Sequence, residues 1–216
     1  MDSAPAIAAF LVAGIAGWFG AGYQHLLFGD AKLRGEPATG RKLLALRAFL
    51  AVSSGVVAAL AFRPDHYDFG PALLTALFGA CLCVLASTDF DRRRIPDRLT
   101  APAFVLALAF CWAWPDRSVA DILLGTAAGL ATGLVLVVVG GFLGNAMGIG
   151  DGKLMILIGA LTGWPAILAA LLYGIILGGV MAVAIMVKRG RRSTYAYGPY
   201  LAAGGAVVLL FADRFN

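Results

Sequence analysis

The chain has 216 residues, of which 61% are hydrophobic and 13% are charged, and its formal net charge is +5. A soluble domain is about half apolar and about one quarter charged, so this composition excludes an ordinary soluble domain and favours the lipid bilayer as solvent. The three cysteines lie inside apolar runs and form no CxxC pair. The sequence therefore predicts no metal and no cofactor.

Eight apolar segments follow one another along the chain. The first runs from residue 4 to about 28, which is too long for the apolar part of a signal peptide and predicts a retained membrane helix. A spanning helix needs about 20 apolar residues, so 99–114 is marginal and 153–163 is short. The other segments are 43–62, 69–88, 119–143, 165–187 and 196–212. The pattern predicts an all-α, polytopic membrane helix bundle, with residues 1–216 forming a single membrane-embedded domain.

The basic residues indicate how these segments are oriented. With the N-terminus outside, four linkers face the cytoplasm and carry 13 of the 17 basic residues, while only 3 lie on the opposite side. This asymmetry satisfies the positive-inside rule and predicts eight segments with both termini outside. It also accounts for the net charge without a nucleic-acid partner, and the basic face suits anionic lipid head groups. The linkers are 29–42, 89–98, 144–153 and 188–195.

Two of these linkers, 89–98 and 144–153, carry acidic residues close to the membrane. Asp89 directly follows the apolar run 69–88, so it belongs to the last turn of a membrane helix, where the helix dipole opposes a negative charge. Asp91 lies among arginines that can pair with it. Asp97 follows Pro96 and is expected to cap a helix that begins near Leu99.

The third linker is rich in glycine and contains Asp151. Six of the residues in 140–152 are glycine, a density that predicts irregular backbone, which at membrane depth must be buried in protein or line a wet cavity. The segment 153–163 would span about 16 Å as a helix, whereas the hydrocarbon is about 30 Å thick. If that segment reaches the outer interface, Asp151 lies below the cytoplasmic surface in a polar recess.

Ionisable residues at membrane depth are candidates for function. If Asp89 and Asp151 approach each other, they cannot easily both ionise, and a pair with one proton can activate water against a peptide carbonyl. Proton-coupled transporters also place acids at this depth. The residues alone leave open an aspartyl protease and a proton relay.

Two motifs resemble those of the type IV prepilin peptidases and, more distantly, of the wider GxGD membrane aspartyl proteases. Residues 89–100 are similar to the family's first aspartate and its I-P-[DN]-x-L-T stretch. Residues 148–154 are similar to its G-x-G-D-x-K-L motif, and residues 197–202 are a softer match to F-G-P-x-L-A. The resemblance covers about residues 69–212.

The resemblance implies that Asp89 and Asp151 are the catalytic pair, with Asp91 as the competing choice in the first motif. It also implies that four residues of these motifs support the catalytic pair: Pro96, Gly148, Gly150 and Lys153. The glycines are expected to permit a bend and close approach of backbone. For Lys153 we favour stabilisation of an ionised Asp151 over simple extension to the interface.

The implied substrate is a prepilin-like precursor with a basic leader before an apolar helix, cut at the cytoplasmic face of a prokaryotic cytoplasmic membrane. Larger members carry two CxxC pairs between the first two membrane segments, whereas 29–42 has no cysteine. The family's N-methyltransferase activity is therefore not expected. The short architecture is similar to members that serve Flp-type pili or archaeal preflagellins.

Overall fold

The computed structural model describes residues 3–28, 36–64, 66–142, 148–189 and 196–215, and all regular structure in these ranges is helical. Within these ranges, eight α-helices correspond to the eight apolar segments, which confirms the all-α membrane bundle. They are α1 (Ala4–Gly20), α3 (Gly40–Ala61), α4 (Phe69–Arg92), α5 (Asp97–Ala109), α6 (Val119–Phe142), α7 (Ile149–Thr162), α8 (Ala166–Arg189) and α9 (Gly198–Leu210). Short 3₁₀ helices add η1 (Ala21–Leu27), η2 (Cys111–Ala113) and η3 (Ala212–Arg214).

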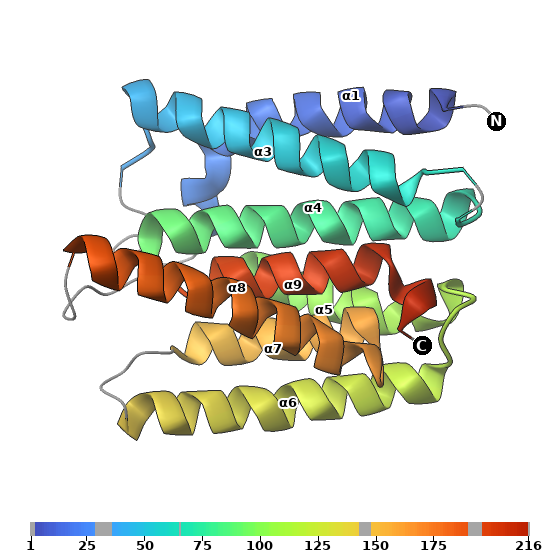
Figure 1. Ribbon diagram of the computed structural model, residues 1–216. Coiled ribbons are helices and arrows are strands. Elements are labelled where there is room, and N and C mark those ends of the chain that lie inside the picture. Colours follow the sequence, from blue (N-terminus) through green and yellow to red (C-terminus); the bar gives the residue numbers. More distant parts are fainter. Residues whose placement is uncertain (1–2, 29–35, 65, 143–147, 190–195, 216) are drawn as a thin grey trace.

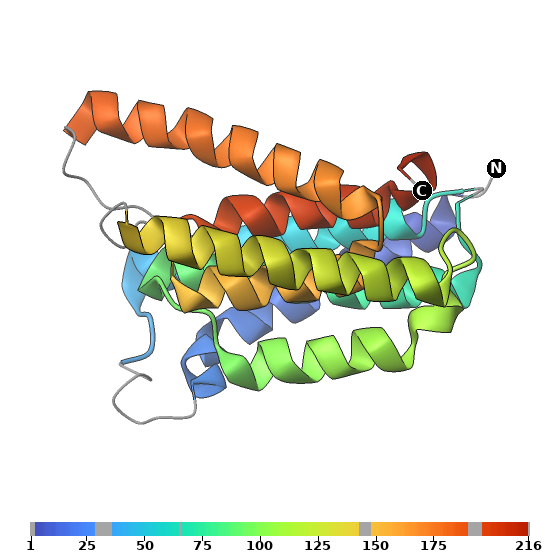
Figure 2. The same cartoon turned by 90° about the horizontal axis from the view of Figure 1, so that it is seen from below.

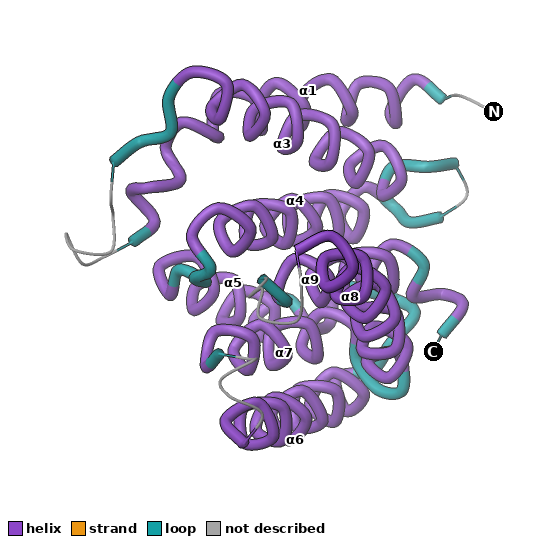
Figure 3. Tube along the Cα trace, turned by 60° about the vertical axis from the view of Figure 1, so that its left-hand side comes forward, coloured by secondary structure: helices purple, strands orange, loops and turns teal. Residues whose placement is uncertain are grey.

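The helices lie roughly along one direction, with α4 between two sets of neighbours (Figure 1). The pair α1 and α3 covers one side of α4, and α6 and α7 lie on the far side of the bundle (Figures 1 and 3). Figure 2 shows α8 on one flank and α5 on the opposite flank. The two ends of the chain lie at the same end of the bundle, and α4 finishes at the other end, where α7 and α9 begin (Figure 1).

Five helical segments are long and apolar enough to cross a membrane: Ala4–Leu27, Gly40–Ala61, Phe69–Arg92, Val119–Val138 and Ala166–Ile185. The helices α5, α7 and α9 are shorter, with 13, 14 and 13 residues. Ten residues of α7 are nevertheless buried, because α5, α6 and α9 surround it. A helix enclosed by protein does not have to match the thickness of the lipid.

Glycines explain how closely α6 and α7 pack. A Cβ atom at Gly125 would lie 2.6 Å from the carbonyl oxygen of Gly159, and one at Gly133 would lie 2.8 Å from that of Gly152. Gly129, midway between them on α6, faces the carbonyl oxygen of Met155. Small residues at this four-residue spacing let two helix backbones approach in a membrane. This contact fixes α7, and with it Asp151, against α6.

The pair α1 and α3 also meets through glycine, since a Cβ at Gly17 would lie 2.6 Å from the carbonyl oxygen of Leu50. The rest of α1 is open, and none of its residues is buried. An apolar groove of about 890 Å³ separates α1 from α4 and is lined mostly by small and aliphatic side chains, with Tyr23, Phe62 and Phe69 among them. Attachment of α1 to the bundle therefore depends on α3.

The limits of two helices differ from the sequence prediction. The helix α4 continues to Arg92, where Arg93 turns into the left-handed region (φ 53°) and donates its N–H to the Asp89 carbonyl at 2.7 Å. The helix α7 begins at Ile149 and α6 ends at Phe142. The prediction of irregular backbone is therefore wrong for 140–142 and 149–152, and residues 143–147 lie outside the described part. Gly152 of this region serves close helix packing instead, since its carbonyl oxygen would lie 2.8 Å from a Cβ at Gly133.

Candidate active site

Three helix ends meet at the end of the bundle opposite the termini. Asp89 lies in the last turn of α4, Asp151 in the first turn of α7, and Gly198 is the first residue of α9. Asp89 is 6% exposed and Asp151 is 8% exposed. A Cβ at position 198 would stand 2.6 Å from Asp89 Oδ2 and 3.2 Å from Asp151 Oδ1. The fold thus brings the two predicted acids to one small buried space.

Each carboxyl interacts with a backbone N–H group at the start of a helix. Asp151 Oδ2 accepts a hydrogen bond of 3.0 Å from the Gly148 N–H, which belongs to the N-terminus of its own helix. The Gly198 N–H interacts with the carboxyl of Asp89. Asp89 Oδ2 is buried and makes no full hydrogen bond within the described part of the chain. The pair therefore retains an acceptor atom that points to the shared space.

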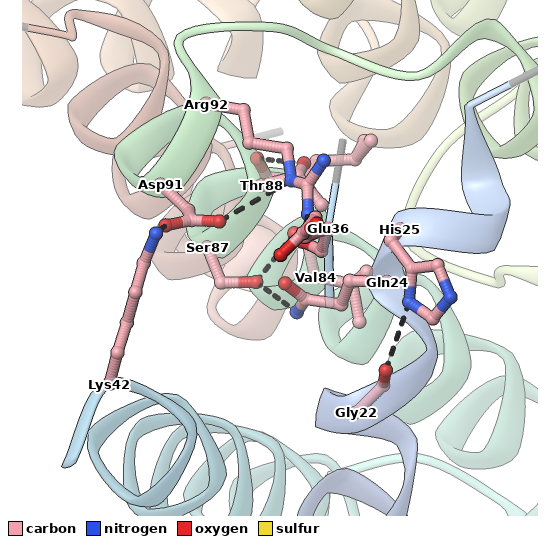
Figure 4. Close-up of polar contacts among 11 residues, drawn as sticks. Gly22, Gln24, His25, Glu36, Lys42, Val84, Ser87, Thr88, Asp91 and Arg92 are labelled. Atoms are coloured by element: carbon pink, nitrogen blue, oxygen red, sulfur yellow. Dashed lines mark hydrogen bonds and ion pairs between the residues drawn. The ribbon is translucent and has the colours of Figure 1, made fainter. Parts of the chain in front are cut away.

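Asp91 lies apart from this pair, although it is only two residues from Asp89. Its Oδ1 lies 2.5 Å from Lys42 Nζ on α3, and its Oδ2 lies 3.4 Å from Arg92 Nε (Figure 4). Side chains two positions apart on a helix point in different directions and so contact different neighbours. The ion pair joins α3 to α4, and Asp89 is the acid of the first motif that faces Asp151.

Lys153 contacts a different acid from the one expected. Its Nζ lies 2.7 Å from Asp97 Oδ1, and both side chains are exposed. The contact joins the first turns of α7 and α5. Asp97 is the first residue of α5 and makes no capping hydrogen bond, so the expectation that it caps this helix is wrong.

The supporting residues of the two motifs start helices. Pro96 is the N-cap of α5, and its carbonyl accepts hydrogen bonds from the Thr100 N–H at 3.1 Å and the Thr100 hydroxyl at 3.0 Å. Gly148 is the extended N-cap of α7. A Cβ at Gly150 would meet Ile95 at 3.4 Å, an ordinary contact. The glycines Gly148 and Gly150 were expected to permit close approach of a neighbouring backbone, and the structure shows no such approach at either one.

A buried hydrogen bond secures α4 just before Asp89. Gln24 of η1 donates from Nε2 to Ser87 Oγ at 2.5 Å, and the Ser87 hydroxyl donates to the Val84 carbonyl at 2.8 Å (Figure 4). Sequence reasoning missed Gln24, although a glutamine inside an apolar segment signals a buried partner. It also missed that Gly198 touches both acids, for which the soft third motif was the available signal.

A second polar cluster lies at the opposite end of α7. The buried Arg117 guanidinium donates to the Leu161 carbonyl and, at 3.3 Å, to Asp116 Oδ1. The Tyr67 hydroxyl donates to Asp116 Oδ2 at 2.7 Å. Burial raises the pKa of Tyr67 well above its ordinary value, so Tyr67 stays a neutral donor. This cluster fixes the end of α7 that lies away from Asp151. Among the described residues, no group of three or more His, Cys, Asp or Glu side chains that could hold a metal ion comes together.

Comparison with known proteins relates the chain to one family. Residues 76–183 match the type IV leader peptidase family. A prepilin leader peptidase/N-methyltransferase of Aeromonas hydrophila is 30% identical over 175 residues, covering 74% of this chain and 56% of that protein. The protein of the same description from Aeromonas salmonicida (strain A449) is 28% identical over 175 residues, covering 74% and 55%. The chain spans about half the length of these curated relatives, and no solved structure matches it.

Proposed function

Since the chain belongs to the type IV leader peptidase family, we propose that it is a membrane aspartyl endopeptidase that removes the leader of prepilin-like precursors. The catalytic pair is Asp89 and Asp151. The observation that carries this proposal is the approach of two buried carboxyl groups, from different helices, to the space beside Gly198. Two acids in such a space favour the state in which one is ionised and the other protonated.

Hydrolysis by this pair follows from general acid–base chemistry. The ionised carboxyl takes a proton from water, and the resulting hydroxide forms a bond to the peptide carbonyl carbon. The protonated carboxyl donates its hydrogen bond to the carbonyl oxygen and stabilises the negative charge that develops there. When the C–N bond breaks, the amine leaves with a proton from the pair, and the products are a carboxylic acid and an amine. The two acids titrate together, so neither role is assigned to one residue.

The location of the pair supports cleavage at the cytoplasmic face. The basic residues gather at the end of the bundle where Asp89 and Asp151 meet, and among those described are Lys42, Arg92, Arg93, Arg94, Arg98 and Lys153. By the positive-inside rule this end faces the cytoplasm. The relatives are bacterial proteins, and the membrane in this proposal is the prokaryotic cytoplasmic (inner) membrane.

The substrate in this proposal has a basic leader followed by an apolar helix, and its cut site lies at the boundary of the membrane. The acids fit such a site because they lie at the ends of helices and within the first or last turn. The proposal covers leader removal alone. The names of the relatives include N-methyltransferase, but residues 29–42, between the first two membrane segments, carry no cysteine.

The test is cleavage of a co-expressed prepilin, followed by the mass of the product. We expect Asp89→Asn and Asp151→Asn each to lower the cleavage rate at least about 1,000-fold, because a carboxamide can neither accept nor donate the catalytic proton. The matched control is Asp91→Asn, which changes an acid of the same helix turn that faces Lys42.

Three results would overturn the proposal. Full cleavage by either Asn variant of the pair would refute the dyad. Uptake driven by a pH gradient in reconstituted vesicles, with no cleavage, would favour a proton-coupled transporter that uses the same aspartates. Pilus assembly that survives both Asn variants would favour a noncatalytic assembly partner.

A further inference from the structure

We propose that Gly198 is a positioning residue of the site. It lies at the N-terminus of α9, and its lack of a side chain leaves the space in which Asp89 and Asp151 approach each other. The catalytic meaning of this inference rests on the proposed function, whereas its geometric part concerns three helix ends and can be tested without activity.

The helix that carries Gly198 is fixed along its length. Nine residues of α9 are buried, and it packs on α4, α7 and α8. Beside the site, the Tyr197 ring occupies the place of a side chain at Gly178 of α8, where a Cβ would lie 2.5 Å from Tyr197 Cε2. At the far end, Arg63 donates a hydrogen bond of 2.8 Å to the Leu210 carbonyl. The first turn of α9 therefore cannot retreat from the two acids when a bulkier residue is placed there.

Space, and not backbone conformation, requires glycine at this position. Positive φ angles among the described glycines occur at Gly40 and Gly163, so the backbone at Gly198 accepts any L-residue. A Cβ there would lie 2.6 Å from Asp89 Oδ2, 3.0 Å from Asp89 Cγ and 3.2 Å from Asp151 Oδ1. The atoms that exclude a methyl group are the reacting carboxyl groups themselves.

The electrostatic setting supports the same assignment. The N-terminus of a helix presents free N–H groups and a partial positive charge. The first N–H of α9 interacts with Asp89, whose Oδ2 is buried and lacks a full hydrogen bond in the described structure. The positive end of α9 favours a carboxylate beside its first turn, and Asp151 at the start of α7 accepts a full hydrogen bond from the Gly148 N–H. Each acid of the pair thus has a helix N-terminus as its support.

Cross-linking tests the geometry without activity. In a background with Cys81→Ala, Cys83→Ala and Cys111→Ala, the pair Asp89→Cys and Asp151→Cys is treated with a short bifunctional thiol reagent. The sulfur of Asp89→Cys takes the place of Asp89 Cγ, which a Cβ at 198 would approach to 3.0 Å. We therefore expect Gly198→Ala to displace this side chain and to slow the cross-link about tenfold. The control is Gly179→Ala, where a Cβ meets open space. An unchanged cross-linking rate in Gly198→Ala would overturn the inference.

Kinetics test the role in the reaction. In the protein with its natural aspartates, Gly198→Ala is expected to lower kcat about 100-fold and to leave KM nearly unchanged, because a small misplacement of catalytic groups acts on the chemical step. Gly179→Ala should keep most of the activity. A wild-type protein that cuts no prepilin would refute the proposed function, while the cross-linking result would still decide the role of Gly198.

A double variant covers the case in which Gly198→Ala folds poorly. If the methyl group collides with the Asp89 carboxyl, then Asp89→Ala should remove the collision and restore the apparent melting temperature lost in Gly198→Ala. An equal loss in the Asp89 and the Asp89→Ala backgrounds would place the collision elsewhere and overturn the inference.

Discussion

The helices α7 and α1 are similar in length and opposite in their surroundings. Ten of the 14 residues of α7 are buried, whereas none of the 17 residues of α1 is. The first is enclosed by α5, α6 and α9, and the second leans on α3 beside an apolar groove. The helix that carries Asp151 is thus held by protein on all sides. The difference indicates that the precision of the site resides in α4, α7 and α9, and that the N-terminal pair can move with less effect on it.

The largest effect is expected from Gly129→Ala, at the contact of α6 with α7. The added methyl group would collide with the carbonyl oxygen of Met155, and backbone atoms in a packed core cannot easily give way. We expect a loss of about 3 kcal/mol or more in the free energy of unfolding, together with loss of cleavage. The measurement is the apparent melting temperature in a fixed detergent. Gly179→Ala is the matched control, and a normal Gly129→Ala protein would show that α7 is held less tightly than its burial indicates.

A smaller effect is expected at the outer end of the same helix. Arg117→Ala would leave the Leu161 carbonyl and the half-buried Asp116 without their cationic donor, which should cost about 2 kcal/mol of stability. If this cluster fixes α7 along its axis, the cross-link between cysteines at 89 and 151 should also slow down. Arg214→Ala, at an exposed position near the same end, serves as the control. Loss of stability with an unchanged cross-link would limit Arg117 to a purely local role.

Between α1 and α3, a glycine-to-alanine substitution should have a smaller effect on stability and on cleavage. Gly17→Ala would press a methyl group on the Leu50 carbonyl, but α1 can shift toward the open groove. We expect a loss of about 1 kcal/mol and a cleavage rate close to that of the wild type. Gly20→Ala, where a Cβ meets nothing, is the control on the same helix. Loss of cleavage in Gly17→Ala, at unchanged expression, would remove the distinction between the two regions.

The smallest change is expected from Lys153→Met. Its ion pair with Asp97 is exposed on both sides, and such pairs contribute about 0.5 kcal/mol. The melting temperature should therefore hardly move, and Lys42→Met, which removes the partner of the nearly buried Asp91, should lower it more. If Lys153→Met abolishes cleavage without a change in stability, then Lys153 acts on Asp151, as the sequence motif suggested.

The positions of the helices could be read from the sequence because hydropathy and charge are local signals. Runs of apolar residues with basic ends gave α3, α4, α6 and α8 within a few residues, and the charge asymmetry agrees with the placement of both termini at one end (Figure 1). The meeting of Asp89 with Asp151 is a tertiary contact, which spacing along the chain cannot specify. The family motifs singled out both acids in advance, and the fold supplied their proximity.

Glycine was the residue that sequence reasoning interpreted least well. A cluster of glycines has the same appearance whether it frees the backbone or admits a neighbouring helix. Gly152 and Gly133 belong to the second kind, which only the packing of α6 on α7 reveals. The partner of a charged residue is equally hard to predict from sequence. Lys153 could pair with Asp151 or with Asp97, and the fold places Asp97, in the first turn of α5, next to its ammonium group.

The short length of α7 has a consequence for biogenesis. A segment of 14 residues falls below the length that enters the bilayer as an independent span, so α7 must be inserted together with a partner. The glycine contacts with α6 make that helix the partner, and the two would enter as a hairpin. Defects at this contact should then appear as rapid degradation of the newly made chain, before a mature protein exists whose activity could be measured.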